Sequence, residues 1–151
     1  LTFIDDRRKW YSHRYGGFFH KLLLDNRNAL LDALMHSCVL VPEWRTEYEI
    51  LRLLTALTES SEGWAVADDA VAFGTVVGVV PTHDAAVKIT SETLRRVRDG
   101  VVPLVDGDPA GDGYITDLLA LVSPPRRVLQ LPARWTIEDV LNWIVSADEP
   151  N

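Results

Sequence analysis

Short apolar runs alternate with amphipathic stretches along the chain, and this pattern predicts strands that alternate with helices. The apolar runs are rich in β-branched residues and are closed by proline or by an acidic residue, which is typical of buried strands that end in turns. We expect four such strands, at residues 38–41, 74–81, 101–105 and 127–131.

Apolar residues recur at helical spacing in the segments around these strands. The predicted helix N-caps are Thr46, Thr82 or Asp84, and Thr136. Residues 60–73 form a connection to which the pattern assigns no structure. We expect helices over residues 18–36, as one helix or two, and over residues 46–58, 85–98, 113–122 and 136–145.

Strands separated by helices imply a parallel sheet, because each connection is long enough for a right-handed crossover. The predicted fold class is therefore α/β, a Rossmann-like open parallel sheet of about four strands flanked by helices. Residues 1–37 are expected to form an N-terminal helical arm, and residues 38–151 the domain itself. The carboxyl ends of parallel strands share one edge, and ligands of open α/β sheets bind there.

The most distinctive chemistry follows the third predicted strand, where Asp106 and Asp108 flank Gly107. Residues alternate along an extended chain, so both carboxylates can face the same side, and Gly107 would leave room for the close approach of a ligand. Two adjacent carboxylates repel each other unless a cation lies between them, and Mg²⁺ prefers oxygen ligands. The alternative is a polar turn after a core strand, because Asp and Gly are common turn residues.

Two glutamates extend this acidic group. Glu43 follows the first predicted strand, and Glu47 lies one helical turn later on the same side. Because parallel strands end at one edge, we expect these glutamates to converge with the two aspartates, and a metal cluster explains the convergence. Glu138 and Asp139 are weaker candidates, since negative charge in the first turn of a helix already suits its dipole. His83 is interpreted as part of a helix-capping loop.

At these residues the sequence resembles the Toprim fold, the catalytic domain shared by topoisomerases, bacterial-type primases and the overcoming-lysogenization-defect (OLD) nucleases. The resemblance rests on VLVPEWRTE, which contains Glu43, and on VDGDPAG, which contains Asp106 and Asp108. A second glutamate four residues after the first, here Glu47, is similar to the OLD nucleases and unlike the primases. The resemblance covers roughly residues 30–145.

The resemblance implies phosphodiester hydrolysis in DNA that depends on Mg²⁺ or Mn²⁺. Asp106 and Asp108 would hold one ion, Glu43 would bind metal or serve as general base, and Glu47 would support a second ion. The chain would then be the Toprim domain of a larger OLD-like ATPase-nuclease. Its ATPase domain would lie outside these 151 residues, and DNA would bind to the full-length protein. A homodimer is left open.

Trp44 departs from the family, which usually has Gly at this position. The indole could crowd the phosphate, stack on a nucleotide, or mark a site that no longer cuts. In the last case the chain is a non-catalytic regulatory or interaction module with a degraded metal site. A primase-like nucleotidyl transferase is disfavoured by Glu47. The later basic residue of the family has no assignable match, although three arginines are available, Arg126, Arg127 and Arg134.

The net charge of −7 argues against broad nonspecific nucleic-acid binding by this chain alone, because phosphate neutralisation needs clustered Lys and Arg. Residues 1–37 are more basic and rich in aromatic side chains, a mixture that fits base stacking or, as the favoured interpretation, packing. The single cysteine, Cys38, predicts an inert thiol in a reducing compartment, so we expect a cytoplasmic location. No apolar run is long enough to span a bilayer, and no membrane partner is expected.

Overall fold

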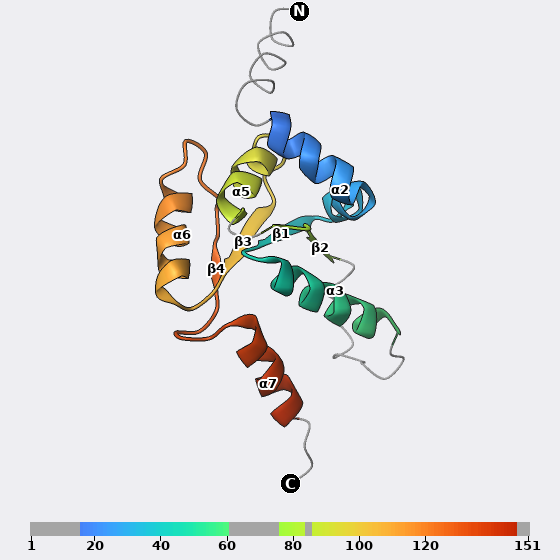
Figure 1. The fold of residues 1–151 in the computed structure, drawn as a ribbon, viewed down its shortest axis with the longest axis vertical. Helices are drawn as coiled ribbons and strands as arrows, with labels where there is room; N and C mark the ends of the chain where they lie inside the picture. Colours follow the sequence, from blue (N-terminus) through green and yellow to red (C-terminus); the bar gives the residue numbers. More distant parts are fainter. Residues whose placement is uncertain (1–15, 61–75, 84–85, 148–151) are drawn as a thin grey trace, which may run out of the picture.

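A four-stranded sheet with helices on both faces organises the described part of the chain (Figure 1). The computed structural model describes residues 16–60, 76–83 and 86–147. Its strands are β1 (Cys38–Pro42), β2 (Val77–Val79), β3 (Val101–Val105) and β4 (Leu129–Gln130). Its helices are α2 (Gly16–Met35), α3 (Arg45–Ser60), α5 (Val87–Arg95), α6 (Pro109–Leu119) and α7 (Ile137–Ala147).

The strands lie in the order β2-β1-β3-β4, and every neighbouring pair is parallel. Leu40 of β1 pairs with Val79 of β2, and Val41 of β1 pairs with Pro103 of β3. This topology confirms the predicted α/β class and the open parallel sheet, which is of Rossmann-like type. The two central strands, β1 and β3, bring their carboxyl ends to the same edge.

Consecutive residues of β1 face opposite helical layers. Val39 and Val41 pack in one core cluster, whereas Leu40 packs in another with Tyr48 and Leu51 of α3. Burial on both faces explains why the strand reads as a continuous apolar run instead of an alternating one. The helical side chains of the first cluster come from α2, α5 and α6, namely Leu30, Ala33, Val87, Leu94 and Leu118.

The strands match the predicted positions but differ in length. β3 has the predicted bounds, and β1 extends one residue further, to Pro42. The edge strands β2 and β4 are shorter than the predicted ranges 74–81 and 127–131. Short edge strands present few unpaired backbone groups, which limits edge-to-edge association.

The start of α3 corrects the predicted cap. The helix begins at Arg45, so Trp44, and not Thr46, occupies the N-cap position. The backbone N–H of Trp44 donates to Oε2 of Glu47 at 2.9 Å. This bond is half of a capping box, in which the third helical residue bonds the backbone of the cap. Trp44 cannot supply the other half, because its indole has a donor but no acceptor for the first N–H groups of the helix.

The other helix starts differ in how they are capped. α6 begins four residues earlier than predicted, because Asp108 caps it and proline follows. α5 begins after Ala86, which makes no side-chain cap, so the expectation that Thr82 caps it is wrong, while Asp84 lies outside the described residues. Thr136 directly precedes α7, as predicted.

Several predictions concern residues that lie wholly or partly outside the described ranges. Residues 1–15, most of the basic aromatic stretch, and residues 61–75, most of the unassigned connection, are among them. The division of the chain at residue 37 stays a prediction.

α2 is interrupted at Asn26, whose φ of −144° and ψ of 34° are not helical, so two helical segments follow each other. Among the residues that are described, no helix has the length and apolar character needed to cross a membrane.

Candidate metal centre at the carboxyl edge of the sheet

The turns after β1 and β3 meet at the carboxyl edge of the sheet. The backbone N–H of Asp106 donates to Oε2 of Glu43 at 3.1 Å, although the two residues lie 63 positions apart. The strands carry them there, because β1 and β3 are neighbours and Pro42 pairs with Leu104. The structure therefore brings together the first glutamate and the first aspartate of the predicted site.

Glu43 is buried, with 2% of its surface exposed. Its second oxygen, Oε1, accepts a hydrogen bond from the indole Nε1–H of Trp44 at 2.8 Å. Each carboxylate oxygen thus receives one N–H, from Trp44 or from Asp106. Burying a carboxylate is strongly unfavourable without such donors, so these two bonds are what allow an acid at this position.

Glu47 is also buried, with 4% of its surface exposed. Burial is the largest cause that raises its pKa, and the negative charges of Asp106 and Glu43 raise the pKa further. Backbone hydrogen bonds, including the one from Trp44, act in the opposite direction. Glu47 therefore accepts the capping bond of α3, and the charges of the other acids also raise its pKa.

Asp106 has the most perturbed environment of the group. Burial and the charge of Glu43, followed by the charges of Asp108, Glu138 and Asp139, raise its pKa from 3.8 to about 6. Its Oδ1 atom is buried and has no hydrogen-bond partner. Carboxylates that repel one another around an unpartnered oxygen are the arrangement that a bound cation relieves.

Asp108 has a structural role of its own. Its Oδ1 accepts the backbone N–H of Gly111 at 2.8 Å and so caps α6. Its charge still reaches Asp106, where it raises the pKa. The segment DGDPAG is therefore a polar turn that starts a helix. The same turn also places a carboxylate near Asp106, so the two interpretations do not exclude each other.

The expectation that Gly107 makes room for a ligand is wrong. A Cβ atom at this position would collide with the backbone carbonyl oxygens of Pro132 and Leu131, so the chain itself fills the space. The backbone N–H of Gly107 donates to the carbonyl of Trp135 at 2.9 Å. The carbonyl of Gly107 accepts from the backbone N–H of Arg134 at 2.5 Å. Gly107 thus fastens the loop between β4 and α7 to the candidate site.

That loop leads into the first turn of α7, which contains Glu138 and Asp139. Asp139 accepts from the backbone N–H of Thr136 at 2.8 Å, and Glu138 accepts from its hydroxyl at 2.7 Å, so the predicted capping role holds. Both charges nevertheless raise the pKa of Asp106. The loop also contains Arg134, whose φ of 70° is unusual for a residue other than glycine.

Sequence reasoning missed Tyr114 of α6. Burial raises its pKa, and the charges of Glu43, Asp108 and Asp117 raise the pKa further. No pattern in the sequence singled it out, because its relation to Glu43 depends on how α6 packs. His83 lies in the loop before α5, where its carbonyl accepts from the backbone N–H of Ala86 at 3.0 Å, and its Nε2 is buried without a partner.

The carboxylates are near one another without forming a ready coordination sphere. In the described ranges, no group of three or more His, Cys, Asp or Glu side chains is already arranged to hold a metal ion. Several of their oxygens instead accept N–H groups, as at Glu43, Glu47 and Asp108. An anionic set made only of oxygen donors fits a hard divalent cation in chemistry and in charge.

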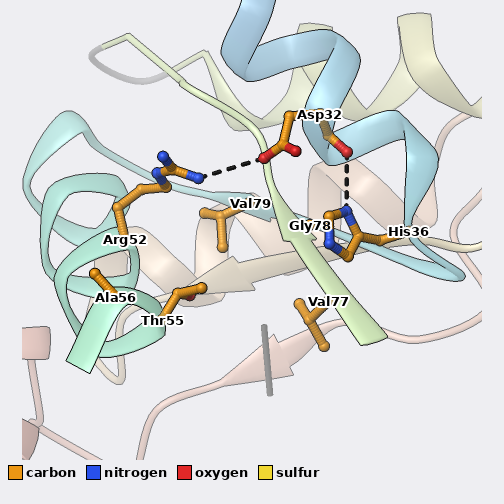
Figure 2. Close-up of a pocket in the computed structure, with 8 residues that line it drawn as sticks. All are labelled: Asp32, His36, Arg52, Thr55, Ala56, Val77, Gly78 and Val79. Carbon is orange, nitrogen blue, oxygen red and sulfur yellow. Dashed lines mark hydrogen bonds and ion pairs between the residues drawn. The ribbon is translucent and has the colours of Figure 1, made fainter. Parts of the chain in front are cut away.

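A cavity of about 250 Å³ lies elsewhere, between α2, α3 and β2 (Figure 2). Arg52 pairs with Asp32 at 3.4 Å across it, and Nδ1 of His36 bonds the backbone carbonyl of Asp32 at 2.9 Å. None of the four predicted site residues lines the cavity. Because its opposite charges already pair with each other, the carboxyl edge is the stronger candidate for a ligand site.

Comparisons with known proteins add no family to this geometry. No family model matches the chain, and comparisons with curated proteins and with solved structures give no match either. The assignment of the site therefore depends on its residues and their arrangement.

Proposed function

We propose that this chain is a Toprim-like domain that binds Mg²⁺ or Mn²⁺ and serves in the hydrolysis of DNA phosphodiester bonds. The proposal combines two supports. One is the resemblance of VLVPEWRTE and VDGDPAG to the Toprim motifs, nearest to those of the OLD nucleases. The other is the contact between Glu43 and the backbone of Asp106, which joins the two motifs at one edge of the sheet.

That contact carries the proposal. An acidic residue after a strand is common, but here the acids of two strands share one site, and Asp106 has a buried oxygen without a partner. Burial, together with the charges of the surrounding carboxylates, raises the pKa of Asp106 to about 6. Perturbed ionisable groups of this kind gather at functional sites.

Four residues are assigned roles. Asp106 and Asp108 would hold one ion, Glu43 would bind metal or act as general base, and Glu47 would support a second ion. A bound pair of cations supplies electrostatic stabilisation of the attacking and leaving oxygens of the phosphodiester. The chain's own part is to hold the acids rigidly, through the β1–β3 pairing and the capping bonds of α3 and α6.

The ATPase partner, DNA as the substrate and a homodimer belong to this proposal as well. With a net charge of −7, the chain itself repels phosphate unless cations are bound. We therefore assign most of the DNA affinity to other parts of the full-length protein. Intracellular action on DNA also fits the expected cytoplasmic location.

The test is cleavage of DNA by the full-length protein with Mn²⁺, in the wild type and in Asp108→Asn. Asparagine caps a helix as well as aspartate does, so this change removes the charge and keeps the cap of α6. We expect cleavage to fall at least about tenfold, the lower end of the losses seen when support of a metal site is removed. Asp99→Asn, an exposed residue before β3 at the opposite end of that strand, is the matched control and should cleave as the wild type does.

A second candidate is a non-catalytic module that retains the fold. The observation that favours it is the engagement of the site by Trp44, whose indole and backbone N–H groups occupy oxygens of Glu43 and Glu47. This candidate predicts that neither Mn²⁺ nor Mg²⁺ supports cleavage and that Asp108→Asn changes nothing. Cleavage by the wild type that is lost in Asp108→Asn would exclude it.

A further inference from the structure

Trp44 connects three parts of the site through four hydrogen bonds. Its indole N–H donates to Glu43, its backbone N–H donates to Glu47, and its carbonyl accepts from the hydroxyl of Thr82 at 3.3 Å. The carbonyl also accepts from the backbone N–H of Tyr48 at 3.5 Å within α3. One residue thus joins the end of β1, the start of α3 and the segment after β2.

The indole bond differs in kind from the other three. A glycine at position 44 could make every backbone contact, but only the side chain of Trp44 reaches Oε1 of Glu43. Trp44 is 38% exposed, whereas Glu43 is 2% exposed. Trp44 is thus in contact with solvent, while the one polar atom of its ring donates to the buried carboxylate.

Hydrogen bonds from neighbouring residues orient the ligands of metal sites and tune their affinity. With the backbone of Asp106 on one oxygen and the indole on the other, Glu43 is held at both ends of its carboxylate. We propose that Trp44 is a positioning residue, whose indole N–H orients Glu43 for cation binding, and not an obstruction of the site. This inference rests on the proposed function, because it assigns Trp44 a role in the same cation site.

Two substitutions separate the N–H group from the bulk of the ring. Trp44→Phe keeps an aromatic ring and loses the donor, whereas Trp44→Gln keeps a side-chain N–H donor and loses the ring. Trp143→Phe is the matched control, since Trp143 of α7 is 60% exposed. The measurement is the affinity of the whole chain for Mn²⁺ alone, by titration calorimetry, with thermal unfolding of each variant as a check of folding.

We expect Trp44→Phe to bind Mn²⁺ about ten- to a hundredfold more weakly than the wild type, the usual loss when a group that orients a metal ligand is removed. Trp44→Gln should recover part of this affinity, and Trp143→Phe should bind as the wild type does. Rescue by a donor of different shape distinguishes positioning from mere packing, because packing would favour Phe over Gln.

The same titrations contain the contrary outcomes. Unchanged binding by Trp44→Phe would show that the indole N–H does not orient Glu43 and would overturn the inference alone. Trp44→Gly is titrated as a fourth variant, and tighter binding by it would show that the indole obstructs the site. Absence of Mn²⁺ binding by the wild type would overturn the proposed function together with the inference.

If Trp44→Phe does not fold, the wild type still decides the matter. The indole N–H resonance of Trp44 should then shift when Mg²⁺ is added, because a cation on Glu43 polarises the shared hydrogen bond. A resonance that does not move, in a chain that binds the ion, would contradict the proposal.

Discussion

The carboxyl edge of the sheet and the cavity between α2 and α3 differ in whether their charged side chains are neutralised by partners. In the cavity, Asp32 has Arg52 as an ionic partner at 3.4 Å. At the edge, none of the ion pairs of the described residues involves Asp106 or its acidic neighbours. Instead, burial and the repulsion among these acids raise the pKa of Asp106 to about 6.

This difference separates a structural polar region from a candidate functional one. A charge that has a partner stabilises the fold modestly and leaves little for a ligand to gain. A set of unneutralised carboxylates is unfavourable in the free protein, and the strain is relieved when a cation arrives. The size of a cavity is therefore a poorer guide to function in this chain than the balance of charge.

The largest expected difference between the two regions is in cleavage. Asp106→Asn removes a charge but keeps the backbone N–H that holds Glu43, so the fold should survive. We expect cleavage of DNA with Mn²⁺ to fall about a hundredfold or more, beyond the loss typical of residues that only support a ligand. Asp32→Asn, the same change in the cavity, should leave cleavage near the wild-type rate. Equal effects of the two changes would remove the distinction between the regions.

The second largest expected effect is that a bound cation raises the free energy of unfolding. Saturating Mn²⁺ at a hundred times its dissociation constant would stabilise the chain by about 2.7 kcal/mol. Asp106→Asn should lose most of this gain, and Asp32→Asn should retain it. Thermal unfolding with and without Mn²⁺ measures both. A gain that persists in Asp106→Asn would place the binding site elsewhere.

Glycine positions in both regions test whether packing and function can be separated. A Cβ atom at Gly107 would collide with Pro132, and one at Gly78 would collide with the backbone of Ala33. Each change to alanine should destabilise the chain by about 1–3 kcal/mol, the usual range for overpacking. Per folded molecule, only Gly107→Ala should reduce cleavage.

A matched control exists on α6. Gly113 faces open space, so Gly113→Ala should stabilise the chain, by up to about 1 kcal/mol, because alanine favours a helix. Urea unfolding of the three variants gives the values. A loss of cleavage per folded molecule in Gly78→Ala would argue that the cavity also takes part in function.

The smallest expected effect is the dependence of stability on pH without metal. The pKa of Asp106 is about 6 in the folded chain against an ordinary value of 3.8, so the folded state binds the proton more tightly than the unfolded state. Stability contributed by the protonated acid is present below about pH 4 and is lost as the pH rises to about 6. The change should be about 1 kcal/mol once solvent screening is considered.

Asp106→Asn isolates that contribution. The free energy of unfolding of the wild type, taken relative to this variant, should fall between pH 4 and 6 by the stated amount. Glu47, whose pKa is raised as well, leaves a slope of the same sign in the variant itself. A wild type that gains stability relative to Asp106→Asn over this range would contradict the repulsion at the edge.

The predictable part of the site is the part that depends on strand order. Glu43 and Asp106 follow apolar runs, and a parallel sheet places the ends of neighbouring strands together, so their proximity could be expected from the sequence. The cap that Asp108 provides for α6 was not predicted, since the helix was expected to begin at residue 113, although aspartate before proline is a common helix start. The partners of these side chains could not be foreseen.

What the sequence determined by itself is the alternation of strands and helices and the placement of acids at strand ends, because both follow from local periodicity and turn chemistry. Tertiary structure alone decided that the loop after β4 packs against Gly107 and brings the charges of Glu138 and Asp139 to Asp106. It also decided that the indole of Trp44 bonds Glu43. These outcomes depend on which surfaces meet when distant segments pack. The hydrogen-bond partner of a buried polar group is then a group on the element that packs against it.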